Sequence, residues 1–497
     1  MPNFMKHIFV CRKRTIIILV LLLIASIYLR LQNRPTMWDE DIARDYLTAF
    51  HIYKYHEFPL VGHYSSGINF FYPPYYYYAL GLLMYISSDY FFILFVFSLI
   101  NALSTLTMFF ISKLWCNEKV GLLSATFYAL SSSMIYMGSN TWTAHVVVPF
   151  FLLSLLSFTI YLKSSRHLFL ILSIFILLFN SFIHLATFPY IFLFLALSVT
   201  LNKLTVKAAA FLGMAVLYLF LLALVPLAVH FGIKETLTAY SPSQNVQITI
   251  DIIKNFFVNT KTVLEVGYNF SSKEIVKSII IIVSLTAYIS IERIRTLKHL
   301  WYPLVMLLIL PVLSAIKSGN TYLQFFTTSV PMLYLLYGYL IFIAFSASKS
   351  KVIRTSIFLV ALALVFFSSK GMLSLRYYTK NYIEAKTIAT GIISDINSLN
   401  INVLAYHRGD FIWDYPAVFY FLEKIKTMKL LSVINDGNIL SAVFPSQTIY
   451  LICTPEQTEN SGVFSCTDKF EKSYLDHSFV EISQSYPTFT VFKYRKN

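Results

Sequence analysis

Long apolar segments recur from the N-terminus to about residue 369 and alternate with short polar ones. A transmembrane helix needs about 20 mostly apolar residues, and lipid forces each segment to satisfy its own backbone hydrogen bonds. The segments are continuously apolar, which does not fit the alternating strands of a membrane barrel. We therefore predict about eleven transmembrane helices, at residues 15–31, 90–112, 119–138, 146–162, 167–182, 188–201, 208–231, 275–291, 299–316, 322–345 and 352–369.

Basic residues gather in the loops on one side of this predicted topology. Nearly every short loop on that side carries at least two of them: Lys6 to Arg14, Lys113 and Lys119, Lys163 and Arg166, Lys203 and Lys207, Arg293 to Lys298, and Lys349 to Arg354. By the positive-inside rule this side and the N-terminus are cytoplasmic. The first apolar segment has no convincing cleavage site after it, so we interpret it as a retained signal anchor in a plasma (inner) membrane protein.

Three larger segments then fall outside the cell: residues 32–89, residues 232–274 and the tail from about Lys370. We expect a transmembrane module at 1–369 and an extracytoplasmic α/β domain at 370–497. The tail alternates strand-like with helix-like segments, which is typical of such domains. The strand-like segments are Ile401–Tyr406, Thr448–Cys453 and Thr488–Tyr494, and the helix-like ones are Tyr382–Leu399 and Pro416–Met428. Whether Cys453 and Cys466 form a disulfide there stays open.

The composition agrees with a membrane protein. Of 497 residues, 57% are hydrophobic and 13% are charged, and the net charge is +15. The basic residues punctuate short loops rather than forming a stripe interleaved with aromatics, so they indicate topology and not a nucleic-acid partner. Walker-type, H-E-x-x-H and C-x-x-C motifs are absent from the sequence.

The first external loop contains an amphipathic pattern at residues 38–57. Apolar residues recur there at helical spacing and form one stripe: Ile42, Tyr46, Ala49, Phe50 and Tyr53. Another face carries Asp41, Arg44, Asp45 and Thr48. We expect a helix that lies in the membrane interface.

The acidic run at the start of this helix has two interpretations. Asp39 or Asp41 could simply cap the helix and complement its dipole. Three consecutive carboxylates, Asp39, Glu40 and Asp41, are more than a cap needs. Since Asp41 and Arg44 are spaced i,i+3, Arg44 can orient Asp41 and keep it ionised. Such a carboxylate could act as a general base towards a hydroxyl or amine.

Several segments in residues 15–165 carry a family resemblance. They read D-I-A-R-D at 41–45, F-P-L-V-G at 58–62, Y-P-P-Y-Y-Y-Y at 72–78, I-S-K-L-W-C-N-E-K at 111–119 and S-N-T-W-T-A-H at 139–145. In order and spacing they resemble the C-type (GT-C) glycosyltransferase superfamily. Within that superfamily, the segments resemble most those of bacterial members akin to protein O-mannosyltransferases and to the aminoarabinose transferase of lipid A.

The resemblance implies an all-α polytopic GT-C-like fold and transfer of a sugar, with inversion, from a polyprenyl-phosphate carrier in the bilayer. The acceptor would be a lipid-linked glycan, lipid A or a protein, as in lipopolysaccharide biosynthesis or protein glycosylation. The catalytic base would be Asp41, with Asp39 and Glu40 as alternatives in a shifted register. The substrate-binding candidates are Arg44, Asp45, Tyr72, His145, Lys317 and Tyr322.

Two positions depart from the family pattern. His145, after Ala144, stands where relatives carry an acidic residue or Asn after Pro, and Tyr72 stands where some carry a polar phosphate contact. His145 could hydrogen-bond, bind a metal or be structural, so no cofactor is required and a divalent metal stays open. Lys317 is then the candidate cation for the leaving phosphate, unless it is an ordinary interfacial lysine.

Other external residues are weaker candidates. His184 fits a structural role better than a functional one, while Lys261 and Glu265 could bound an acceptor or lipid groove.

Three other functions compete with this interpretation. A secondary transporter or flippase would place ionisable residues near the membrane midplane, and the predicted spans hold few. A polymerase or ligase using polyprenyl-diphosphate-linked glycans would carry Arg and His in later external loops, and residues 232–274 lack Arg. A non-catalytic assembly subunit would tolerate loss of the acidic run.

Overall fold

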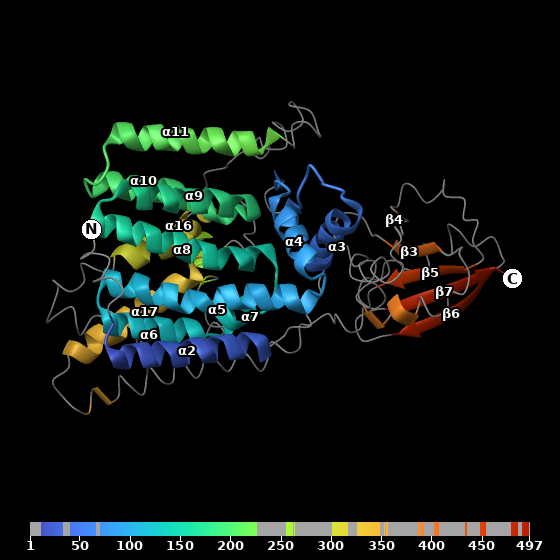
Figure 1. Ribbon diagram of the computed structural model, residues 1–497, viewed down its shortest axis with the longest axis horizontal. Helices are drawn as coiled ribbons and strands as arrows, with labels where there is room; N and C mark the ends of the chain where they lie inside the picture. The colour runs from blue at the N-terminus through green and yellow to red at the C-terminus, as the bar shows by residue number, and fades with distance from the viewer. Residues whose placement is uncertain are drawn as a thin grey trace. The chain divides into compact units, whose positions relative to one another are not determined.

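The computed structural model describes residues 11–32, 40–65, 70–225, 255–261, 263, 301–316, 326–347, 352, 354–355, 386–387, 389–391 and five C-terminal strands (Figure 1). The chain divides into two compact units. Unit 1 comprises Met1–Arg34, Pro59–Tyr76 and Asp89–Arg376, and unit 2 comprises Pro35–Phe58, Tyr77–Ser88 and Tyr377–Asn497.

Unit 1 is built from helices that run side by side (Figure 1). Along the chain they are α2 (Lys13–Gln32), α5 (Tyr90–Trp115), α6 (Glu118–Leu130), α7 (Ser132–Gly138), α8 (Thr143–Ser164), α9 (His167–Ile183), the short η1 (Leu185–Thr187), α10 (Pro189–Thr200), α11 (Val206–Ala223), α16 (Trp301–Ile316) and α17 (Val330–Ala347). Helix α8 packs against α5 and α9, while α6 packs against α5 and α17. A short hairpin of β1 (Tyr64–Ser65) and β2 (Phe70–Phe71) precedes α5.

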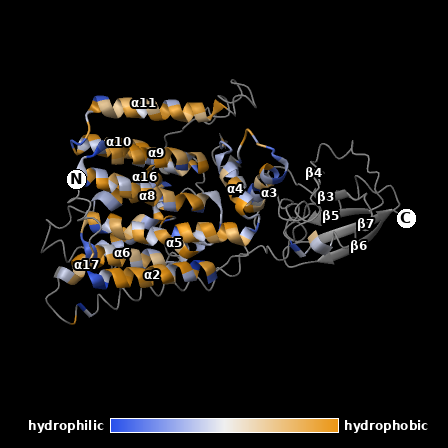
Figure 2. Ribbon diagram, viewed as in Figure 1, coloured by the Kyte–Doolittle hydropathy of each residue, from blue (hydrophilic) through white to orange (hydrophobic). Residues whose placement is uncertain are grey.

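The helices of unit 1 are those of a membrane protein. Within the described residues, four are long and apolar enough to cross a bilayer, α2, α5, α8 and α11, or up to five if α6 and α7 form one broken span. Helices α9, α10, α16 and α17 are apolar but shorter. Figure 2 shows apolar residues covering most of these helices. Within the described residues each predicted span overlaps a single helix, except 119–138, which holds two, and 275–291 and 352–369, which lie wholly or largely outside the described residues.

One predicted span is wrong in detail. Residues 119–138 were expected to form a single helix, but α6 and α7 meet at a bend of 62°. Ser131 separates them: its backbone is extended, and its Oγ accepts a hydrogen bond from Met134 N at 3.5 Å, which caps α7. Its hydroxyl also lies 2.5 Å from the Tyr334 hydroxyl of α17. A serine that caps a new helix and bonds a neighbouring helix favours the break over a continuous span.

Arg30, near the end of α2, is fully buried in unit 1. Its Nε donates to Asn101 Oδ1 at 2.8 Å, and its Nη1 donates to the backbone oxygens of Ser26 at 3.1 Å and Ala129 at 3.3 Å. Ala129 lies in the last turn of α6, where the break removes helical donors. The guanidinium therefore satisfies a carbonyl that the bend exposes, as buried polar groups must be inside a membrane.

Unit 2 contains α3 (Glu40–Tyr55), most of α4 (Tyr75–Ile86) and a five-stranded sheet. The strands are β3 (Asn402–Tyr406), β4 (Val433–Ile434), β5 (Thr448–Cys453), β6 (Phe479–Ser485) and β7 (Thr490–Lys496), in the order β4-β3-β5-β7-β6. Strand β3 is parallel to β4 and β5, and β7 is antiparallel to β5 and β6.

The sequence anticipated part of this sheet. The segments Ile401–Tyr406 and Thr448–Cys453 coincide with β3 and β5, and Thr488–Tyr494 overlaps β7, whereas β4 and β6 were not foreseen. The helices expected at 382–399 and 416–428 lie largely or wholly outside the described residues. The α/β class and the 370–497 boundary therefore stay predictions.

Candidate functional site

The amphipathic pattern at residues 38–57 forms a helix, as predicted. Helix α3 spans Glu40–Tyr55, and its apolar stripe is buried at Ile42, Tyr46, Ala49 and Phe50. Asp41 in the first turn and Lys54 in the last complement the helix dipole. His56 follows with φ 56°, a left-handed residue that reverses the chain and ends the helix.

A close helix crossing within unit 2 holds α3 in place. A Cβ on Gly81 of α4 would lie 3.0 Å from Ile52 Cγ2, so a glycine lets the two helices approach. At the far end of the crossing, the rings of Tyr53 and Tyr85 meet edge-to-face with centroids 5.3 Å apart. Tyr85 also lies within hydrogen-bond distance of His56 Nδ1, at 3.0 Å. The acidic residues are therefore carried by a packed helix pair rather than by a loop.

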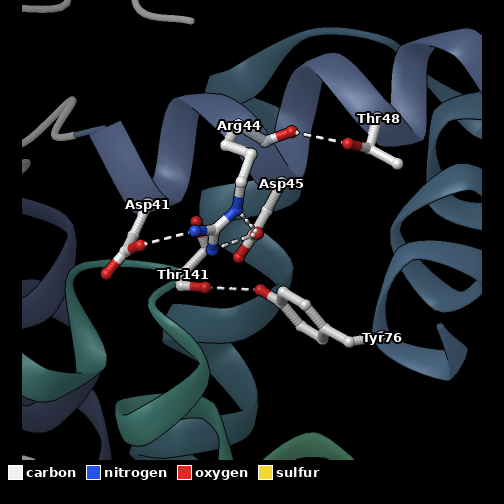
Figure 3. A network of polar contacts seen from close by, with 6 residues as sticks. All are labelled: Asp41, Arg44, Asp45, Thr48, Tyr76 and Thr141. Carbon is white, nitrogen blue, oxygen red and sulfur yellow. Dashed lines mark hydrogen bonds and ion pairs between the residues drawn. The ribbon is translucent and has the colours of Figure 1, made fainter. Parts of the chain in front are cut away.

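Arg44 joins two carboxylates of α3 (Figure 3). Its Nη1 donates to Asp41 Oδ1 at 2.8 Å, and its Nη2 and Nε donate to Asp45 Oδ1 at 2.8 Å and 3.1 Å. The side chain of Asp41 is 41% exposed, while that of Asp45 is 1% exposed. We call Asp41, Arg44 and Asp45 the acidic triad. Its exposed member, Asp41, is the one that solvent can reach.

The two ends of the acidic triad differ in electrostatics. Burial raises the pKa of Asp45 to about 6, although Arg44 lowers it. Burial alone would lower the pKa of Arg44, but the carboxylates of Asp45 and Asp41 raise it well above its usual value, so the guanidinium stays charged. With both carboxylates ionised, the triad carries a net charge of −1. Tyr77 of α4 lies beside it, and burial raises its pKa, which keeps the phenol neutral.

Tyr72, in unit 1, is buried and held by its surroundings. Its hydroxyl accepts a hydrogen bond from Leu185 N at 3.2 Å. Its ring stacks on His63 at 4.3 Å and lies near His184 at 6.1 Å, both nearly parallel to it. Burial lowers the pKa of His184 to about 4, so this imidazole is neutral at physiological pH. The stack joins the segment before α4 to the turn between α9 and α10.

His145, also in unit 1, is buried at the start of α8. Its Nδ1 lies 2.7 Å from Asn140 Oδ1. The amide of Asn140 is oriented by two other bonds: its Nδ2 donates to Tyr136 O at 2.9 Å, and its Oδ1 accepts from Trp142 N at 3.1 Å. Since Asn140 thus presents an acceptor, the proton of neutral His145 lies on Nδ1. The lone pair is left on Nε2, the side from which this imidazole can accept a hydrogen bond.

The remaining candidates divide between described and undescribed parts of the chain. Asp39, Lys317, Tyr322 and Glu265 lie outside the described residues, as do Cys466 and the side chains of Glu40 and Cys453, so the open question of a Cys453–Cys466 disulfide is not tested. Lys261 is exposed on a short helical segment of unit 1. Among the side chains that are described, no three His, Cys, Asp or Glu form a group able to hold a metal ion.

No protein-family model matches the chain, and no curated protein matches its sequence. Solved structures do match it. One is the oligosaccharyltransferase of Archaeoglobus fulgidus tethered to an acceptor peptide containing the NVT sequon, with a TM-score of 0.50, 11% identity, and coverage of 83% of this chain and 63% of that one. The chain is similar in fold to this oligosaccharyltransferase.

A second structure of the same enzyme, in complex with Zn and sulfate, matches with a TM-score of 0.47, 11% identity, and coverage of 87% of this chain and 67% of that one. The chain thus spans less than two thirds of the first oligosaccharyltransferase structure. At this identity the similarity to the first structure concerns the fold alone. The bacterial subgroup named from the motifs stays a prediction.

Some site residues were missed by the sequence analysis. Asn140, which orients His145, lies inside the S-N-T-W-T-A-H segment, but its contact was not predicted. The two residues are five positions apart, a spacing that does not indicate a contact within a helix. His63 was not singled out, and the contact of His184, which was interpreted as structural, with Tyr72 was not foreseen, because both contacts arise from the fold. Tyr77 sits in a run of four tyrosines, and the sequence does not tell which of them faces the acidic triad.

Proposed function

We propose that the chain is a membrane glycosyltransferase that moves a sugar from a polyprenyl-phosphate carrier to an extracytoplasmic acceptor. The acceptor is a lipid-linked glycan, lipid A or a protein. The fold similarity to an oligosaccharyltransferase supports this class of reaction. The observation that carries the proposal is the acidic triad: a half-exposed Asp41, held by Arg44, on the amphipathic helix α3.

Asp41 is the proposed general base. An acceptor hydroxyl would give its proton to Asp41 as its oxygen attacks the anomeric carbon. The bond between that carbon and the phosphate oxygen would break, and polyprenyl phosphate would leave with the bonding electrons. A single displacement of this kind inverts the anomeric centre. General-base assistance contributes typically about 10²–10⁴-fold to such a step.

Arg44 and Asp45 have supporting roles in this proposal. Arg44 orients Asp41 and keeps it ionised, since a nearby cation favours the charged carboxylate. Two of the three hydrogen bonds that Arg44 donates within the triad go to the buried Asp45, and the third, from Nη1, holds Asp41. The triad keeps a net negative charge, which a proton acceptor needs. Lys317 would balance the charge that develops on the leaving phosphate.

The test is sugar transfer in membranes containing the wild-type protein or Asp41→Asn, with a panel of polyprenyl-phosphate sugars. Glu57→Gln is the matched control, because it neutralises another partly exposed carboxylate in unit 2, paired with His51 rather than with Arg44. We expect Asp41→Asn to lower the turnover about 10²–10⁴-fold and Glu57→Gln to leave it near wild type. Equal turnover in Asp41→Asn and wild type, in correctly folded protein, would reject Asp41 as the base.

A further inference from the structure

Two interhelical turns of unit 1 are fastened to each other on the membrane face that the charge pattern predicts to be cytoplasmic. Lys203, after α10, donates from Nζ to Ser165 Oγ at 2.8 Å. Tyr161 of α8 donates from its hydroxyl to Lys203 O at 3.0 Å. Ser165 and Asn202 both adopt left-handed backbone conformations, with φ 56° and 53°, which gives each turn a defined shape. The α8–α9 and α10–α11 turns therefore form one connected surface.

Three cations lie in or next to these two turns. Lys163 is in the last turn of α8, with its Nζ 5.7 Å from the centre of the Trp115 ring. Arg166 precedes α9, and Lys203 lies on the fastened turn. We call Lys163, Arg166 and Lys203 the basic turn pair. Within the part of the chain that the structure describes, no carboxylate forms an ion pair with any of them.

An apolar strip begins directly beside these cations. Leu168, Ile171 and Phe175 follow one another at helical spacing along α9, and they are 71%, 53% and 64% exposed. In a membrane protein such a strip faces acyl chains. A ligand that fits both features is anionic at one end and apolar along its length. A free phosphate ion would use the cations but leave the strip without a role.

We propose that the basic turn pair binds the phosphodiester headgroup of an anionic phospholipid, with one acyl chain lying along the exposed strip of α9. Basic sites between helices on the cytoplasmic side are suited to anionic headgroups. The site shares no residue with the acidic triad and does not depend on the proposed transferase activity.

The test compares two triple variants of the full-length protein by native mass spectrometry in detergent. Phosphatidylglycerol and phosphatidylcholine with the same acyl chains are titrated as probes. The first variant is Lys163→Gln, Arg166→Gln, Lys203→Gln. The control is Arg14→Gln, Lys113→Gln, Lys119→Gln, which removes the same charge from the same predicted face at other helix ends.

Each cation at an anionic surface contributes about fivefold in affinity. We expect wild type to prefer phosphatidylglycerol, the first variant to bind it about 100-fold more weakly, and the control to remain within about fivefold of wild type. Lys203→Gln alone should cost about fivefold, which keeps the test usable if the triple variant does not fold. Equal losses in both triple variants would indicate diffuse attraction and overturn the proposal. No preference of wild type for phosphatidylglycerol would overturn it as well.

Discussion

Replacing Asp45 by Asn tests the electrostatic account of the acidic triad most directly. Asp45 is buried, and burial raises its pKa from an ordinary value of 3.8 to about 6. Asn has nearly the same shape and can still accept a hydrogen bond from Arg44, but it binds no proton in this range. The variant therefore removes one titration from the folded protein with little change in packing.

The sign of the effect follows from the raised pKa. A folded protein that binds this proton more tightly than the unfolded chain is stabilised when Asp45 is protonated. That contribution is fully present below about pH 4 and is lost as the pH rises through about 6. A rise of the pKa from 3.8 to about 6 corresponds to about 3 kcal/mol at most. The stability of wild type minus that of Asp45→Asn should therefore fall by up to about 3 kcal/mol between pH 4 and pH 8.

The assay is equilibrium unfolding in mixed detergent micelles at a series of pH values. Taking the difference between the two proteins removes every titration that they share. Glu57→Gln serves as the control for the loss of one carboxylate at a partly exposed position of unit 2. A difference between wild type and Asp45→Asn that stays constant across pH 4–8, or that grows with pH, would refute the inference that burial dominates at Asp45. It would mean instead that Arg44 holds Asp45 ionised without cost.

Two further predictions concern unit 1. A Cβ on Gly62 would lie 2.5 Å from the backbone oxygen of Tyr72, so Gly62→Ala should destabilise the protein by about 1–3 kcal/mol. The control is Gly213→Ala, whose added Cβ would have its nearest neighbour at 3.8 Å and which should be neutral or stabilising. Thermal unfolding of both variants in the same detergent gives the comparison. Asn140→Leu removes the acceptor that holds the His145 proton on Nδ1, so the ring should then populate both neutral tautomers. Nitrogen-15 NMR would detect the changed tautomer mixture, and an unchanged spectrum would contradict the assignment made from the hydrogen bonds.

Local patterns predicted some of this structure well. The i,i+3 spacing of Asp41 and Arg44 becomes an ion pair of 2.8 Å, because both residues belong to one helix whose period is known. Asp45 was placed on the polar face of the same helix, yet it is buried. A helical period says which residues share a face, but the partners that cover that face come from distant parts of the chain. The same limit explains why Tyr77 and the Asn140–His145 bond were not foreseen.

The break in the span at 119–138 shows a second limit. Hydropathy averages over about 19 residues, so it counts the apolar length of α6 and α7 together and is insensitive to a single serine between them. Ser131 ends one helix and begins the next because its hydroxyl has two partners, Met134 N in α7 and the Tyr334 hydroxyl in α17. Tyr334 is about two hundred residues away along the chain. Arg30 then compensates the carbonyl that the bend leaves open. Each of these requirements is a tertiary one.

In the acidic triad, one cation, Arg44, pairs with two carboxylates of unequal exposure, Asp41 and Asp45. This arrangement has a physical advantage over a single ion pair. A lone carboxylate beside a membrane loses its charge easily when it is desolvated, and a single ion pair would neutralise it. Arg44 presents a planar fork of donors, which lets it hold a buried Asp45 and a half-exposed Asp41 at the same time. Asp45 anchors the guanidinium within the helix packing, and Asp41 keeps its ionisation while facing outward. A lysine, with a single compact ammonium group, could not divide its contacts in this way.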